Sequence, residues 1–180
     1  MKKNLTYLFV LSFVSVLFSA CVKDTDFDQA DDILLTPVVE LDLIYFNLEA
    51  GDFFDVNTSN PVLTVRDTTD LRFLNDGISN DIVRAEFLFN FTNSIPRNFD
   101  VLFQFLGEQN DTTYVTQTSV IEGTTRAPVI TQFIHNVEGE AISQLTQASK
   151  VVVSVTIPSS NANLEGELNL QSKTTYYLEF

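Results

Sequence analysis

The sequence predicts an all-β protein, an antiparallel β-sandwich of immunoglobulin-like type with one short helix. Three observations support this class. After residue 34, apolar residues recur mainly at every second position, which is the period of half-buried strands. Many short segments of this kind are separated by turn residues, and only one segment has helical spacing. Residues 34–180 are therefore expected to form one domain, which is long enough to bury a core without disulfides.

The clearest strands lie in the middle of the chain. From Ile82 to Phe91, phenylalanines and small apolar residues alternate with polar ones, and Phe99 to Phe105 repeats the pattern. Residues 92–98 between them carry turn chemistry, with two Asn, a Ser and a Pro. The pattern predicts a hairpin whose inner face is rich in Phe.

The other strands are predicted from the same alternation. Their ranges are 37–48, 62–66, 70–74, 114–121, 129–136, 150–157, 164–170 and 174–180. Glu138 to Ser149 is the predicted helix, because Ala141, Ile142, Leu145 and Ala148 recur at helical spacing.

The first twenty residues have the composition of a secretory signal. Lys2 and Lys3 precede an uncharged apolar run, Leu5 to Phe18, which ends in Ser19 and Ala20. A membrane-spanning helix needs about 20 apolar residues, and this run is shorter. We therefore expect residues 1–20 to be removed as a signal peptide.

The only cysteine follows directly after this leader. Residues 17–21, Leu-Phe-Ser-Ala-Cys, resemble the bacterial lipobox. The resemblance implies cleavage between Ala20 and Cys21 and attachment of lipid to Cys21. A single cysteine cannot form an internal disulfide, and lipidation accounts for it. Several acyl chains on one residue anchor a protein stably on a membrane. Apart from this lipid, no cofactor is expected.

Residues 21–33 are predicted to be a flexible, acidic tether between the lipid and the domain. The order Val22-Lys23-Asp24-Thr25-Asp26 resembles the export signal of surface lipoproteins of the Bacteroidota. The resemblance implies an outer-membrane lipoprotein, exposed at the cell surface through Lys23, Asp24 and Asp26, with the periplasmic face as the alternative. Alternating aspartates also mimic the start of a calcium loop, but Gln29 and Leu35 replace its glycine and its last glutamate.

The charge of the chain excludes one class of partner. The leader contains two lysines and no acid, so the chain after it keeps 24 acidic and 8 basic side chains, a net charge near −16. Nucleic-acid binding depends on clustered Lys and Arg, so no nucleic-acid partner is expected.

The sequence contains little that indicates catalysis or metal binding. His135 is the only histidine, and no Gly-x-Ser-x-Gly motif is present. One His without a free Cys does not supply a zinc site. The acid pairs Asp52/Asp55 and Glu138/Glu140 are expected to be loop and capping groups. A non-enzymatic protein is therefore predicted, and a hydrolase would need His135 or converging acids in a cleft.

The type and spacing of the aromatic residues help to distinguish an interaction role from ligand binding. There is no Trp, and most Phe lie at core-like spacing. Tyr45, Phe53, Phe54 and Tyr114 are candidates for exposure, with packing in the core or at an edge as the expected role.

The preferred prediction is a membrane-anchored lipoprotein with a structural or protein-interaction role, for example as an accessory subunit of an outer-membrane complex with an envelope protein partner. The alternative is a glycan- or small-ligand-binding accessory lipoprotein of a nutrient-uptake system.

Overall fold

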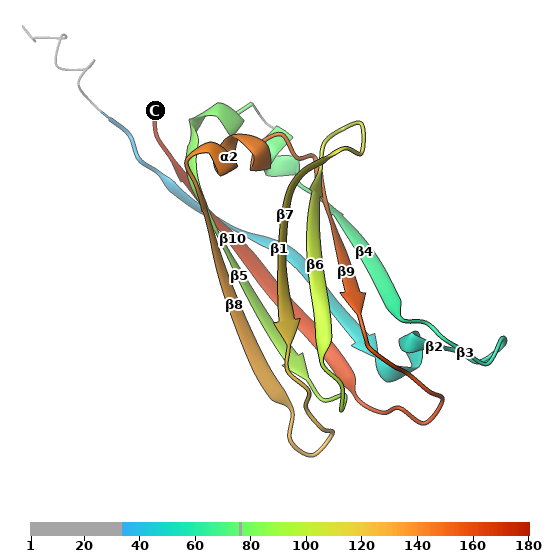
Figure 1. Cartoon of the computed structure of the whole chain (residues 1–180). Helices are drawn as coiled ribbons and strands as arrows, with labels where there is room; N and C mark the ends of the chain where they lie inside the picture. Colours follow the sequence, from blue (N-terminus) through green and yellow to red (C-terminus); the bar gives the residue numbers. More distant parts are fainter. Residues whose placement is uncertain (1–33, 76) are drawn as a thin grey trace, which may run out of the picture. The chain divides into compact units, whose positions relative to one another are not determined.

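The computed structural model describes residues 34–75 and 77–180. Most of this part of the chain forms two four-stranded antiparallel sheets (Figure 1). The first sheet has the order β1-β10-β5-β8 and the second the order β4-β9-β6-β7. The strands of the first sheet are β1 (Val38–Glu49), β10 (Glu167–Leu178), β5 (Ile82–Asn93) and β8 (Val129–Glu138). Those of the second are β4 (Thr64–Asp70), β9 (Lys150–Thr156), β6 (Phe99–Leu106) and β7 (Thr112–Val120).

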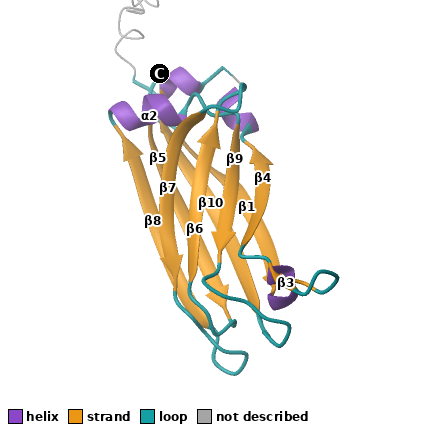
Figure 2. Ribbon diagram, turned by 45° about the vertical axis from the view of Figure 1, so that its right-hand side comes forward, coloured by secondary structure: helices purple, strands orange, loops and turns teal. Residues whose placement is uncertain are grey.

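Short elements lie at both ends of the sandwich. The helix α2 (Glu140–Leu145) and the 3-10 turns η3 (Arg72–Asn75) and η4 (Ser79–Asp81) lie at the end that also holds the C-terminus (Figure 2). The opposite end holds the 3-10 turn η2 (Ala50–Phe53), the two-residue strands β2 (Phe54–Asp55) and β3 (Asn60–Pro61), and the loops after β5, β7 and β9.

The predicted antiparallel β-sandwich with one short helix is confirmed, and the strand order describes it more closely. Eight strands in the orders 1-10-5-8 and 4-9-6-7 are the double Greek key of a jelly roll. An immunoglobulin sandwich instead joins its strands in the orders ABED and CFG. The class is therefore as expected, while the connectivity within it is that of a jelly roll.

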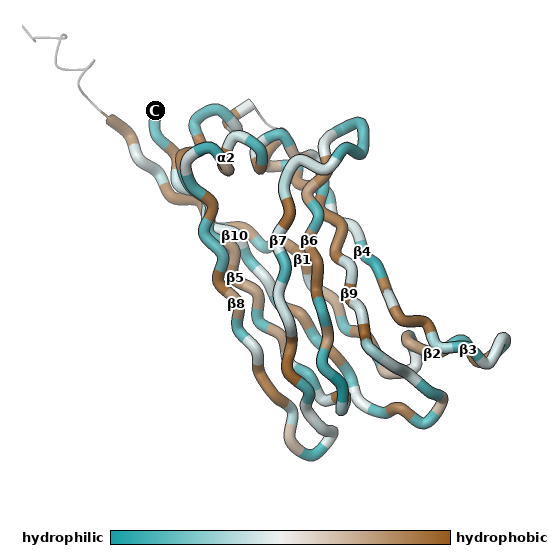
Figure 3. Tube along the Cα trace, viewed as in Figure 1, coloured by the Kyte–Doolittle hydropathy of each residue, from teal (hydrophilic) through white to brown (hydrophobic). Residues whose placement is uncertain are grey.

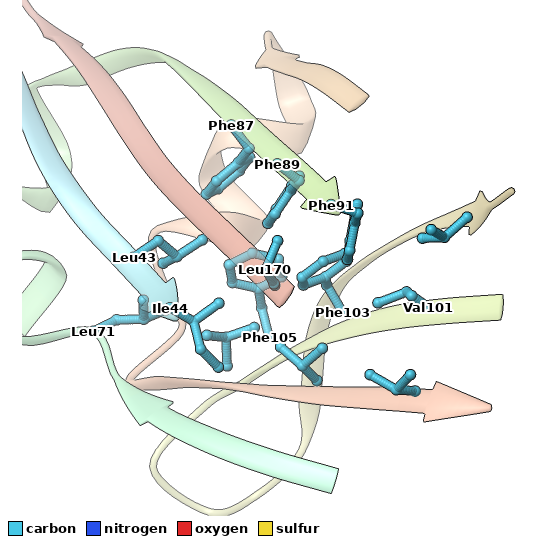
Figure 4. Packing of buried hydrophobic residues seen from close by; sticks show 14 of the residues in the cluster. Leu43, Ile44, Leu71, Phe87, Phe89, Phe91, Val101, Phe103, Phe105 and Leu170 are labelled. Carbon is cyan, nitrogen blue, oxygen red and sulfur yellow. The ribbon is translucent and has the colours of Figure 1, made fainter. Parts of the chain in front are cut away.

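The core lies between the sheets and is built from the alternating Phe residues. Hydrophobic and polar residues alternate along the strands (Figure 3). Phe87, Phe89 and Phe91 of β5 and Phe103 and Phe105 of β6 are fully buried. They project from the two sheets toward each other, and the rings of Phe89 and Phe103 have centroids 4.0 Å apart (Figure 4).

The predicted hairpin of β5 and β6 is wrong. β5 pairs with β10 and β8, whereas β6 pairs with β7 and β9, so the two strands belong to different sheets. Residues 94–98 cross from one sheet to the other. A hairpin would place both Phe rows side by side on one face, and the crossing instead buries each row against the other.

The alternation along β5 predicts that Val83 shares the inner face with Ala85 and Phe87, but Val83 is 45% exposed. The pairing of β5 with β10 shifts register next to it, so that Tyr177 lies opposite Arg84 and Leu178 opposite Ile82. Because of this bulge, Ile82 takes the buried position and Val83 turns to solvent.

Two further strand predictions differ from the structure. The segment 70–74 contributes to η3, because Leu71 and Leu74 are both buried and their spacing of three suits a 3-10 turn. The predicted strands 164–170 and 174–180 are parts of one strand, β10. Residues 171–173 are polar and separate the two predicted strands in the sequence. They nevertheless continue β10, because the buried Ser172 is hydrogen-bonded to the backbone of Ile44 in β1.

Ile44 lies at a bulge in β1. The register of β1 with β10 shifts between Asp42 and Tyr45, which leaves the backbone of Ile44 without its regular ladder partner. The Ser172 hydroxyl accepts from the Ile44 N–H at 3.0 Å and donates to the Ile44 carbonyl at 2.7 Å. A buried serine therefore replaces two backbone hydrogen bonds within the core.

Candidate functional site

The residues predicted to carry the lipid and the export signal lie outside the described residues. This applies to the signal peptide 1–20, to Ala20 and Cys21, to Lys23, Asp24 and Asp26, and to the whole of the tether 21–33. Within the described ranges, no helix is long and apolar enough to cross a bilayer.

His135 lies on β8, in a half-buried position between the edges of the two sheets. Its Nε2 forms a 2.6 Å hydrogen bond with the hydroxyl of Tyr114 on β7. The imidazole also stacks on Phe133, with ring centroids 5.7 Å apart. Burial lowers the pKa of His135 and raises that of Tyr114. The pair thus joins the two sheets as neutral groups, and no carboxylate is hydrogen-bonded to the imidazole in the part of the chain that the structure describes.

This burial predicts a pH dependence of stability. The pKa of folded His135 lies below its ordinary value of 6.5, so the unfolded chain binds this proton at higher pH than the folded chain. The resulting stabilisation is fully present above pH 6.5 and is lost as the pH falls toward the folded pKa. Thermal unfolding between pH 7.5 and 5 should show a steeper loss of Tm for the unsubstituted protein than for His135→Gln. Parallel curves would contradict this assignment.

The acid pairs named from the sequence have structural roles. The Asp52 carboxylate accepts the Glu49 N–H at 2.8 Å at the start of η2. Asp55 accepts from the Thr58 hydroxyl and the Asn57 N–H, and these bonds lower the pKa of Asp55.

Of the other pair, Glu138 forms an ion pair with Arg84 at 3.2 Å. Glu140 lies in the first turn of α2, where a negative charge favours the helix. Asp52, Asp55 and Glu140 therefore serve the loops and the helix end, as expected from the sequence, whereas Glu138 lies at the end of β8 and pairs across the strands with Arg84.

A cavity of about 510 Å³ lies at the loop end of the sandwich. The residues that line it include Glu49, Glu165 and Glu167, together with Thr92 and Ser94. All three glutamates are exposed, whereas a carboxyl that serves as a general acid is shielded from water. The cavity lining contains no aromatic side chain on which a sugar ring could stack.

Hydrogen bonds between loops hold this end together. The Asn93 amide, fully buried, donates to the carbonyls of Arg97 and Ile121 at 2.9 Å and accepts from the Ile95 N–H at 2.8 Å. The Ser94 hydroxyl donates to the carbonyl and accepts from the N–H of Glu167, the first residue of β10. The segment that crosses from β5 to β6 is therefore hydrogen-bonded both to the loop after β7 and to the start of β10.

The aromatic candidates do not form a binding platform. Phe53 is fully buried, Phe54 and Tyr114 are half-buried, and Tyr45 is 52% exposed. Phe180, also exposed, lies beside Leu35 and is thus far along β1 from Tyr45. Glycan-binding sites of the stacking kind need coplanar exposed rings, and these two rings are isolated from each other.

The two sides of the sandwich differ in how their edge strands are protected. On one side, β1 carries Glu40, Asp42 and a bulge, and β4 carries Arg66, Asp67 and Asp70. Charges and bulges are the features that keep exposed edges from pairing with other chains.

The opposite side, formed by β7 and β8, has little of this protection: one register shift at the start of β7, near Thr112, and one charged residue, Glu138, at the end of β8. Residues 112–121 and 127–137 contain no Asp, Glu, Lys or Arg, in a chain of net charge −14. We call the outer edges of β7 and β8 the uncharged edge. Ile130 and Ile134 project from β8 and are 72% and 52% exposed. Among the described residues, β8 pairs only with β5 and β7 only with β6.

The uncharged edge was not identified from the sequence. Both uncharged runs are visible there, but they resemble ordinary strands until the topology shows that each lies at the edge of its sheet. It is the candidate functional site that the structure adds.

No protein-family model matches the chain, and no curated protein matches it in sequence. Among solved structures, the VP2 subviral particle of infectious bursal disease virus aligns with a TM-score of 0.48 and 11% identity, over 79% of this chain and 32% of that one. A protein of Parabacteroides distasonis, provisionally named as secreted, aligns with a TM-score of 0.47 and 14% identity, over 63% of this chain and 37% of that one. The chain spans about a third of the length of either protein, and these similarities carry no argument about function.

Proposed function

We propose that the protein is a non-enzymatic lipoprotein, held on the outer membrane by lipid on Cys21 and exposed at the cell surface through Lys23, Asp24 and Asp26. Its sandwich serves protein–protein interaction, as part of an envelope complex. The observation that carries the interaction role is the uncharged edge. The two adjacent edge strands of this acidic domain contain no proline and, apart from Glu138 at the end of β8, no charge, so they expose backbone groups that another strand can pair with.

The point at which the chain enters the sandwich is compatible with a partner at the uncharged edge. β1 begins at Val38, at the end of the sandwich that also holds α2 and the C-terminus. Strands β7 and β8 run along the full length of the sandwich, so their edges are not confined to the end at which the chain enters. A lipid attached upstream of β1 leaves these edges accessible to a partner in the same envelope.

Substitution of Cys21 tests the anchor. Cys21→Ser removes the thiol that accepts the lipid, so we expect complete loss of fatty-acid labelling and accumulation of unlipidated precursor or of soluble protein. Val22→Ala, at the next position, is the matched control and should keep both properties. Fatty-acid labelling that persists in Cys21→Ser would contradict the anchor.

Site-specific photo-crosslinking in intact cells tests the interaction role. A photoreactive side chain at Gln132, exposed on β8, should give discrete crosslinked species. The same group at Gln171, an exposed glutamine on the central strand β10, should not. Equal crosslinking at both positions, or none at Gln132, would contradict a role for the uncharged edge.

A further inference from the structure

The outer edge of β8 is built to accept another strand. Its register with β5 is continuous from Val129 to Glu138, without a bulge. A regular edge strand presents a straight row of N–H and C=O groups to whatever approaches it. The nine residues from Val129 to Val137 include no charge and no proline that would hinder pairing.

The side chains on β8 have a nearly symmetric order about Gln132. Ile130 and Ile134 lie two positions to either side of it, and all three project from the same face. If a second β8 strand runs antiparallel with Gln132 opposite its own counterpart, each Ile130 lies opposite an Ile134. Each exposed isoleucine then packs beside its counterpart and loses part of its exposed surface, and the two glutamine amides lie within reach of each other.

We propose that the partner at the uncharged edge is a second copy of this chain, joined by antiparallel β8–β8 pairing centred on Gln132. The inference rests on the interaction role proposed above and names the partner. Such an interface is two-fold symmetric, with the same surface contributed by both copies.

Charge favours this partner. Two copies of a chain with net charge −14 repel each other wherever carboxylates meet, and the β7–β8 side is where they can approach without such contacts. The two-fold axis of an antiparallel strand pair is perpendicular to the sheet, so it also brings the two β7 edges toward each other. Residues 112–121 are uncharged as well. Self-pairing requires this, because it brings the two β7 edges together, whereas a partner that pairs with β8 alone does not require it.

A partner of opposite charge would be recognised elsewhere. A basic protein gains most from the carboxylates of the loop end or of the β1–β4 side, and the uncharged edge offers it no complementary charge. Self-pairing needs no complementary charge.

Cysteine crosslinking of the full chain tests the register. Residues directly opposite in an antiparallel pair have Cα atoms about 4.5–5.5 Å apart, within the range of roughly 4.4–6.8 Å that a disulfide spans. Gln132→Cys should therefore form a covalent dimer under mild oxidation. Ile130→Cys alone and Ile134→Cys alone should not, whereas the two expressed together, with different tags, should form a mixed dimer. Gln171→Cys and the unsubstituted chain, which retains Cys21, are the controls.

A charge substitution gives a second measurement. Gln132→Asp places two carboxylates opposite each other and should shift the detergent-solubilised chain from the mass of a dimer to that of a monomer. Gln171→Asp should leave the dimer intact. A monomeric unsubstituted chain, equal crosslinking at Gln132 and Gln171, or self-crosslinking of Ile130→Cys would overturn the proposal. Photo-crosslinks from Gln132 to a different protein, without self-crosslinks, would overturn the second copy as partner and leave the interaction role supported.

Discussion

Gly123→Ala is expected to destabilise the domain by about 3 kcal/mol. A Cβ at this position would lie 1.9 Å from the carbonyl oxygen of Asn93 and 3.0 Å from the backbone nitrogen of Val129. Both atoms belong to backbone, so neither can move aside as the end of a flexible side chain would.

The surroundings of Gly123 increase this effect. Its N–H donates to the carbonyl of Ile95 at 3.1 Å, and the buried Asn93 amide bonds the carbonyl of Ile121 nearby. Relief of the clash therefore requires the loop before β8 to separate from the crossing between β5 and β6, which breaks these hydrogen bonds.

Thermal unfolding measures the expected result. For a domain of this size, about 3 kcal/mol corresponds to a decrease in Tm of roughly 6–12 °C. Gly51→Ala is the matched control, because no atom lies within 4 Å of its added Cβ and its φ is not positive. We expect its Tm to stay close to that of the unsubstituted protein. Similar Tm values for the two variants would show that the loop end adapts to the clash.

Phe89→Ala is expected to cost about 3–5 kcal/mol, the range for removing a large buried side chain. Phe89 is fully buried at the centre of the sandwich. Its ring centroid lies 4.0 Å from that of Phe103, 6.0 Å from that of Phe87 and 5.9 Å from that of Phe133. The substitution removes contacts with both sheets and leaves a cavity that the surrounding strands cannot fill.

Two further variants separate the loss of volume from a general effect on β5. Phe89→Leu keeps most of the apolar volume and should lose less stability than Phe89→Ala. Val83→Ala lies in the same strand, at the exposed bulge, and should have a small effect. Chemical denaturation with linear extrapolation measures all three. A loss for Val83→Ala as large as that for Phe89→Ala would contradict the assigned core.

The strands themselves could be predicted because alternation is a local property. Phe87, Phe89 and Phe91 of β5, like Phe103 and Phe105 of β6, show by spacing alone which face is buried. The helix could also be predicted, because Ala141, Ile142 and Leu145 recur at helical spacing, although it ends at Leu145 and Ala148 lies beyond it.

The errors occurred where a residue's partner is distant in the sequence. Ser172 suggested a break in the last strand, and its bonds to Ile44, 128 positions away, keep β10 continuous. The Phe rows of β5 and β6 suggested a hairpin, because periodicity does not show which of two sheets a strand joins.

The sequence by itself determined the class of the domain, its buried faces and its acidity, because each follows from residue type and spacing along the chain. It also carries the predicted signal peptide, lipidation at Cys21 and export signal, which do not depend on the fold of the domain. Only the tertiary structure decided that β7 and β8 are edge strands and that His135 bonds Tyr114 across the sheets. The physical reason is that an edge is defined by the strand that is missing beside it, and this depends on the pairing of segments far apart in the chain.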